Sequence, residues 1–190
     1  MQRSRPLATT NPEFSVLEWP GFREYRVENW HLARDGSQRV IKGATGLDWK
    51  LAIASVVLGL FWMKIRESTW ATITASVLCV YFVWVKCTQV LYESVIVIAP
   101  HGIQLETHRG FPPSSVLSAS RRFIPMSALQ DFVINEGLRR WNVRYYLTAI
   151  QRNGENDFSL HVAYENILPH IPVLLEVYKA VQTMLFSNSS

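Results

Sequence analysis

The side chains that could do metal or acid–base chemistry show no catalytic spacing. No histidine stands at a metal-ligand distance from a cysteine or a carboxylate in the sequence. The two cysteines, Cys79 and Cys87, provide no disulfide framework. We therefore expect neither a metal site nor a cofactor. The five histidines considered are His31, His101, His108, His161 and His170.

A nucleotide-sugar site is not visible either. Such a site needs a glycine-rich loop at a helix N-terminus to hold a diphosphate, and none of the nine glycines forms a G-x-G pattern. No G-x-S-x-G elbow and no Ser–His–Asp constellation is present. The acidic residues fall in predicted strands and turns, where solvation explains them. We expect that the chain alone is not an enzyme. Autonomous catalysis is kept as an alternative, beside the two non-catalytic roles considered below. These acidic residues are Asp131, Glu136, Glu155, Asp157 and Glu165.

Basic residues offer a second kind of chemistry, the binding of phosphate groups. Arg139, Arg140 and Trp141 stand together in a predicted loop, and arginine donates in pairs to phosphate while tryptophan suits a membrane interface. We interpret these three residues as a lipid-headgroup site, against the alternative of solvated loop charges. The net charge of +4 is mild and no long basic run occurs, so we expect no nucleic-acid partner.

Two uncharged apolar runs lie in the middle of the chain and divide it into an N-terminal and a C-terminal part. Residues 51–63 and 68–85 are separated by the charged turn 64–67, and neither run has a polar stripe. Their lengths, extended by Trp49 and Lys50, predict a membrane-embedded helical hairpin over residues 49–86. A buried hairpin inside a soluble protein is the alternative. Whether the hairpin crosses the bilayer or dips into it stays open at this level.

The flanking segments indicate an orientation. Positive residues outnumber those of the turn at the outer ends of the two runs, which places both termini in the cytosol. A sequon at Asn188 would then never meet the glycosylation machinery. We expect a flexible tail over residues 1–20 without a signal peptide, and a strand-containing segment over 21–48 that packs on the later domain.

The part after the second run has β character. The run 94–98 is apolar on both faces and predicts a covered strand, and further strands are predicted at 103–107, 129–136, 143–149 and 158–164, with a loop at 109–120. A helical stripe over 171–185 closes the chain, and residues 187–190 form a tail. Strands followed by one covering helix predict an α+β fold: a small antiparallel, pleckstrin-homology-like (PH-like) cytosolic domain over 93–186.

Five short motifs in this domain resemble a known family. They are residues 101–105 (HGIQL), 123–125 (FIP), 129–136 (LQDFVINE), 145–147 (YYL) and 174–178 (LLEVY). The chain resembles the PIG-H family, the H subunit of phosphatidylinositol N-acetylglucosaminyltransferase. That complex transfers GlcNAc from UDP-GlcNAc to phosphatidylinositol at the cytoplasmic face of the endoplasmic reticulum, the first step of GPI-anchor synthesis.

The resemblance implies a non-catalytic accessory subunit. Its hairpin would anchor and stabilise the catalytic glycosyltransferase subunit at the bilayer, beside other small membrane subunits. We expect the strand at 129–136 and the final helix to form the docking face. A phosphoinositide-reading PH-like adaptor without a glycosyltransferase partner is the alternative. The docking residues expected are Asp131, Phe132, Ile134, Asn135, Glu136 and Tyr178.

Overall fold

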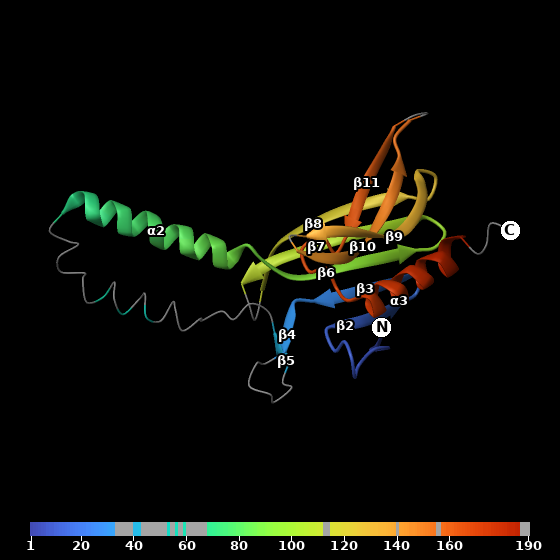
Figure 1. Cartoon of the computed structure of the whole chain (residues 1–190), viewed down its shortest axis with the longest axis horizontal. Coiled ribbons are helices and arrows are strands. Elements are labelled where there is room, and N and C mark those ends of the chain that lie inside the picture. Colours follow the sequence, from blue (N-terminus) through green and yellow to red (C-terminus); the bar gives the residue numbers. More distant parts are fainter. Residues whose placement is uncertain are drawn as a thin grey trace. The chain divides into compact units, whose positions relative to one another are not determined.

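The computed structural model describes residues 1–32, 40–42, 53, 56, 59, 68–111, 115–139, 141–154 and 157–186. Figure 1 shows the elements in chain order. The N-terminal strands are β1 (Gln2–Ser4), β2 (Phe14–Trp19), β3 (Phe22–Glu28), β4 (Trp30–Leu32) and β5 (Val40–Lys42). After helix α2 (Thr69–Cys87) come β6 (Gln89–Ile98), β7 (Gly102–Phe111), β8 (Ser115–Pro125), β9 (Leu129–Arg139), β10 (Asn142–Arg152) and β11 (Phe158–Ala163). Helix α3 (Ile171–Val181) continues into the π-helical turn η1 (Gln182–Phe186).

The chain divides into two compact units. The first comprises Met1–Asn29, Tyr92–His108 and Ala119–Ser190, and the second comprises Trp30–Leu91 and Arg109–Ser118. The first unit therefore holds the buried core with α3, while the second holds the β4–β5 pair and α2. The α+β fold expected from the sequence is confirmed, because the strands pair antiparallel in the registers given below and two helices accompany them.

The start of the chain differs from the expected flexible tail. Strand β2 lies within residues 1–20, and Phe14 and Leu17 are among the most buried side chains of the first unit. Strand β1 pairs with β2, and β2 pairs with β3 from Phe14 opposite Val27 to Trp19 opposite Phe22. The polar residues that precede Phe14 suggested a tail. The core cluster that buries Phe14 includes side chains of α3, far along the chain, which the local sequence does not reveal.

Strand β3 joins the two halves of the chain. Its residues pair antiparallel with β6, from Arg23 opposite Val97 to Glu28 opposite Tyr92. The resulting sheet has the order β1-β2-β3-β6-β7-β8. The expected packing of the 21–48 segment on the later domain thus takes the form of a shared sheet for β3. Strand β5 pairs with β4 instead.

The segment 109–120, expected as a loop, is largely strand. Strand β7 continues to Phe111 and β8 begins at Ser115, so only residues 112–114 between them lie outside the described part of the chain. Pro112 and Pro113 suggested a loop for the whole stretch. The extended backbone on both sides nevertheless carries the β7–β8 pairing of the large sheet.

A second sheet has the order β11-β10-β9. Its register places Leu147 between Ile134 on β9 and Ala163 on β11. Helix α3 and η1 tie the two sheets together: the Gln182 side chain donates to the Phe132 carbonyl, and Met184 meets the Tyr25 hydroxyl. The apolar stripe predicted for this helix comprises Ile171, Leu174, Leu175, Tyr178, Val181 and Leu185, of which Leu174, Val181 and Leu185 are buried while Ile171 and Leu175 are exposed. The buried helix side chains are Val173, Leu174, Val177, Val181 and Leu185.

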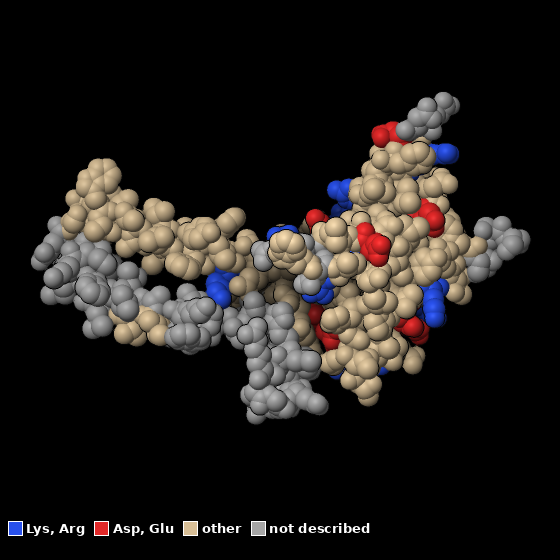
Figure 2. Space-filling model, in the orientation of Figure 1, with Lys and Arg blue, Asp and Glu red and all other residues tan. Residues whose placement is uncertain are grey.

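Helix α2 is a candidate membrane span. Its apolar stretch has a mean hydropathy of 1.5, and Ala75 is the one buried side chain among the described residues of the helix. At 1.5 Å per residue the helix is roughly 28 Å long, close to the thickness of a hydrocarbon core. Its hydroxyl side chains bond to carbonyls one turn earlier, as Thr74 does to Trp70 and Ser76 to Thr72, both at 2.8 Å. Apart from Lys86 in its last turn, the helix therefore presents an uncharged surface on which the hydroxyl groups of Thr74 and Ser76 are bonded within the helix, tan in Figure 2.

The first half of the predicted hairpin lies largely outside the described residues. Of the run 51–63, the structure describes Ile53, Val56 and Gly59, each of them helical. The turn 64–67 is also outside the described part. The hairpin therefore stays a prediction for its first helix.

Gly102 is a position where only glycine fits. Its φ of +144° disfavours any L side chain, and a Cβ would lie 2.2 Å from the Ile124 carbonyl oxygen. We predict that Gly102→Ala lowers the free energy of unfolding by about 3 kcal/mol or more, since both strain and a backbone clash must be relieved. Thermal unfolding in detergent measures the loss. Gly154→Ala is the matched control, because nothing lies within 4 Å of a Cβ there; equal losses in the two variants would contradict the prediction.

Candidate functional site

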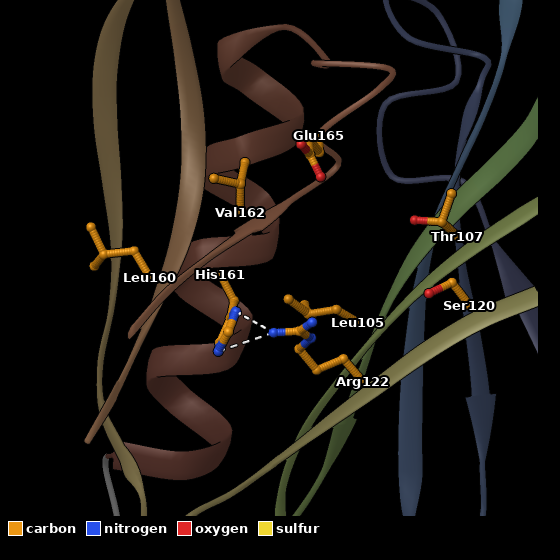
Figure 3. Close-up of a pocket in the computed structure, with 8 residues that line it drawn as sticks. All are labelled: Leu105, Thr107, Ser120, Arg122, Leu160, His161, Val162 and Glu165. Carbon is orange, nitrogen blue, oxygen red and sulfur yellow. Dashed lines mark hydrogen bonds between the residues drawn. The ribbon is translucent and has the colours of Figure 1, made fainter. Parts of the chain in front are cut away.

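A cavity of about 270 Å³ opens between the two sheets of the first unit, along β7, β8 and β11. Figure 3 shows Arg122 of β8 and His161 of β11 in direct contact within its lining. The Arg122 guanidinium donates to Nδ1 of His161 at 2.8 Å, and Nε2 of His161 is 3.0 Å from the side-chain oxygen of Gln151. Since arginine can only donate, the proton of this imidazole belongs on Nε2. Leu105, Thr107, Ser120, Leu160, Val162 and Glu165 complete the lining.

The electrostatics of this cavity favour a neutral imidazole. Burial lowers the pKa of His161, and the neighbouring charge of Arg122 lowers it further. Both nitrogens of His161 are already engaged with side chains of the same fold. The pair therefore acts as a bridge between β8 and β11 rather than as a free acid or base.

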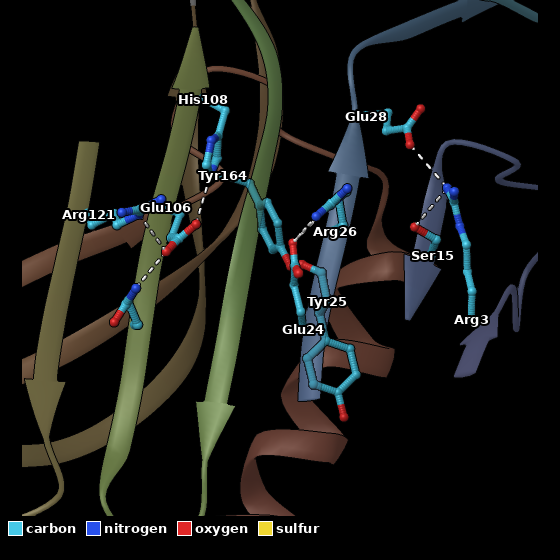
Figure 4. Close-up of polar contacts among 11 residues, drawn as sticks. Arg3, Ser15, Glu24, Tyr25, Arg26, Glu28, Glu106, His108, Arg121 and Tyr164 are labelled. Carbon is cyan, nitrogen blue, oxygen red and sulfur yellow. Dashed lines mark hydrogen bonds and ion pairs between the residues drawn. The ribbon is translucent and has the colours of Figure 1, made fainter. Parts of the chain in front are cut away.

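A second polar cluster covers one face of the large sheet (Figure 4). Glu106 of β7 accepts from His108 at 2.6 Å and from Arg121 at 3.1 Å. Tyr92 stacks on the His108 ring at 4.3 Å, and the Arg26 guanidinium lies 4.3 Å from the Tyr92 ring centre on β6. Burial raises the pKa of Tyr92. These contacts link β3, β6, β7 and β8 through side chains as well as through the backbone.

The most buried carboxyl group belongs to Glu93 of β6, which is 2% exposed. Its oxygens accept from the Thr107 hydroxyl at 3.1 Å and from the Asn166 side-chain amide at 2.7 Å. The backbone N–H groups of Asn166 and Ile167 donate as well, at 3.1 and 3.0 Å. Glu93 therefore fastens β6 and β7 to the turn that follows β11.

That turn has an unusual backbone. Tyr164 and Leu168 both have positive φ values, 57° and 48°. The Tyr164 hydroxyl donates to the Tyr25 carbonyl at 2.8 Å, and burial raises the pKa of this phenol well above its usual value, with the Glu93 charge contributing. The strained turn is held from two sides, by the Glu93 acceptor and by the Tyr164 bond to β3.

The expected docking residues do not form one surface. Phe132 is fully buried in the core and Ile134 is partly buried against it. Asp131 accepts the Phe132 N–H at 2.7 Å, and Tyr178 is half-buried on α3. Asn135 and Glu136 are exposed near the end of β9, where they point to opposite faces of the strand.

The expected lipid-headgroup residues lie at the turn between β9 and β10. Trp141 is 99% exposed there. Arg139 ends β9, with its backbone opposite Asn142, while its side chain and the whole of Arg140 lie outside the described part of the chain. The sequence reasoning missed the apolar neighbours of this turn, Leu138 and Val143, which are also exposed. The run GLRRWNVR at 137–144, basic and apolar without an acid, was the available signal.

Among the described residues, no group of three or more histidine, cysteine or acidic side chains could hold a metal ion. Glu93 is fully hydrogen-bonded within the fold, whereas Ser94, Thr148 and Nδ1 of His108 are buried without a hydrogen-bond partner in the part of the chain that the structure describes. The surfaces that the described residues offer to other molecules include the exposed end of the β9–β10 hairpin, the outer face of β9 and the apolar flank of α2.

Comparisons with known proteins bear on this domain. Residues 94–165 match the family model described as the PIG-H component of the GPI-GlcNAc transferase complex. The resemblance to PIG-H is confirmed. Phosphatidylinositol N-acetylglucosaminyltransferase subunit gpi15 of Schizosaccharomyces pombe is 37% identical over 99 residues, which cover 52% of this chain and 57% of that protein. No solved structure matches the chain.

The PIG-H match coincides with a definite part of the fold. It runs from within β6 to just beyond β11, so it contains both hairpins of the small sheet and the Arg122–His161 bridge. Helices α2 and α3 and the N-terminal strands lie outside it. Both matches are to proteins named as components of a GlcNAc transferase, and the chain spans less than two thirds of the length of the Schizosaccharomyces pombe relative.

The Glu93 contacts give a stability prediction. In Glu93→Gln, a side-chain NH₂ replaces an acceptor oxygen and faces backbone N–H donors, so we expect a loss of about 2–3 kcal/mol in the free energy of unfolding. Chemical unfolding in detergent, followed by tryptophan fluorescence, measures it. Glu18→Gln serves as the control, since its pair with Arg23 is exposed and should contribute about 1 kcal/mol at most. A Glu93→Gln variant as stable as this control would show that the contacts are not structural.

Proposed function

We propose that this chain is a non-catalytic accessory subunit of the endoplasmic-reticulum complex that transfers GlcNAc from UDP-GlcNAc to phosphatidylinositol. Its role is to anchor and stabilise the catalytic glycosyltransferase subunit at the cytoplasmic face. The observation that carries the proposal is the PIG-H match over a sheet domain that begins directly after a bilayer-length apolar helix. Only Thr88 separates α2 from β6 in the sequence.

The internal use of the polar side chains supports an accessory role. Glu93, Glu106 and His161 would be the natural candidates for acid–base work, yet each is engaged with neighbouring strands or turns. They hold the shape of the domain. Two sheets tied together by a C-terminal helix also support the PH-like arrangement that we propose for this domain.

Strand pairing supports the helical hairpin. Strand β3 precedes the apolar runs and β6 follows them, and the two are neighbours in one sheet. Both flanks of the apolar segment must then lie on the same side of a membrane. A spanning α2 therefore requires a second crossing before it, for which residues 51–63 are the apolar candidate. With the positive residues counted above, this side is the cytosol.

The proposed partnership predicts co-purification. The tagged chain, extracted from endoplasmic-reticulum membranes in mild detergent, should elute with a glycosyltransferase subunit whose level falls when the chain is removed. Asn135→Arg, on the outer face of β9, should reduce the co-eluting partner several-fold because it adds a charge to the proposed docking face. Asn153→Arg, the same change at the exposed β10–β11 turn, is the control. Elution of the native chain alone, with the level of the transferase unaffected by its removal, would refute the proposal.

The proposed topology predicts a glycosylation pattern. The native sequon at Asn188 should stay unmodified, whereas a flexible insertion carrying a sequon between Lys64 and Glu67 should be glycosylated, since it would face the lumen. Sensitivity of the chain's electrophoretic mobility to endoglycosidase reports both sites. Modification at Asn188 would reverse the orientation, and modification at both sites would contradict the hairpin.

A further inference from the structure

The β9–β10 hairpin carries its apolar side chains out of the core toward its turn. Along one face of β10 the exposed fraction rises from 0% at Leu147 to 38% at Tyr145 and 54% at Val143. Leu138, opposite Val143 on β9, is 84% exposed, and Trp141 at the turn is 99% exposed. The inner face of the small sheet thus extends beyond the core that covers it. We call Leu138, Trp141 and Val143 the hairpin tip.

The charge around the tip has one sign. Residues 137–144 contain three arginines and no acid. Large apolar side chains with arginine neighbours are the combination that favours the headgroup level of an anionic bilayer, where tryptophan is enriched and each basic residue contributes attraction.

The backbone of the tip is suited to the same environment. Unpaired N–H and C=O groups are expensive in lipid, but Leu138 pairs with Val143 and Arg139 with Asn142 right up to the turn. The paired hairpin can therefore place its side chains in the interface while it exposes few unsatisfied backbone groups.

We propose that the hairpin tip is a second membrane contact of this protein, which inserts Trp141 and Leu138 among the headgroups of an anionic leaflet. This proposal rests on the membrane anchoring proposed above, because a spanning α2 followed after one residue by β6 keeps the domain at the bilayer surface and makes a weak contact effective. The ligand is the lipid surface itself, not one particular phosphoinositide.

Strand β10 supplies an internal control. It connects the tip to the β10–β11 turn, and its 11 residues separate the two turns by roughly 35 Å at about 3.3 Å per residue. If the tip inserts with the strand directed away from the bilayer, the other end stands in water, whereas a domain lying flat on the surface would bring both ends to the headgroups. Two reporters on the same strand therefore distinguish insertion of the tip from general adsorption of the domain.

The experiment uses the full chain in nanodiscs of phosphatidylcholine with phosphatidylinositol, and in phosphatidylcholine alone. Three single-cysteine proteins carry an environment-sensitive fluorophore: native Cys79 in α2, Asn142→Cys beside the tip, and Gly154→Cys at the opposite turn, with the remaining native cysteines changed to serine. Nitroxide lipids then quench whichever label touches the bilayer. We expect quenching at positions 79 and 142 and none at 154.

Variants of the tip give the proposal its sharpest test. Trp141→Ser and Leu138→Asn should each reduce quenching at position 142, and neutralising Arg139 or Arg140 should lower the inserted-to-free ratio by about fivefold per arginine in the anionic discs. Quenching at 79 but not at 142 would overturn this inference alone. Loss of quenching at 79 would overturn the anchoring on which it rests. A label at 142 that is shielded only when other subunits co-purify would assign the tip to a protein partner instead.

Discussion

The buried Glu93 carboxyl group is the contact on which the architecture of the sheet domain depends. It lies on a largely apolar strand, and it is tolerated there because four donors converge on it. Two of these donors are backbone N–H groups of the turn after β11. The carboxyl group therefore fixes where the chain leaves the small sheet and enters α3, and α3 in turn seals the core between the two sheets.

Other polar side chains also connect strands of the fold. The Arg122–His161 bridge joins the edge strands β8 and β11, and Glu106 gathers donors from its own strand and from the neighbouring β8. These side chains are engaged with neighbouring strands of the same fold. The surfaces open to other molecules include the apolar helix α2, the outer face of β9 and the exposed end of the β9–β10 hairpin. Such surfaces are consistent with the accessory role proposed above.

Local patterns predicted the fold only where burial is local. The alternation of apolar and polar residues around Leu147 and the apolar stripe on α3 are regular over many residues. Strands β9–β11 and the helix were therefore predicted close to their observed bounds. Strand β2 was missed because Phe14 is buried by contacts distant in sequence. The Glu93 site was equally invisible, since its donors at Asn166 and Ile167 are more than seventy positions away. The predicted docking set mixed core and surface because a motif records resemblance without telling which side of a strand faces inward.

The pairing of β3 with β6 also governs how this protein is made. Strands β2 and β3 leave the ribosome first. Their apolar faces stay uncovered until the two apolar runs, then β6 and finally α3 have been synthesised. At ~5–20 residues per second, the roughly 150 residues involved take on the order of 10–30 s. During that interval Phe14 lacks the α3 side chains with which it shares the core, so the N-terminal hairpin must persist without its complete apolar cover.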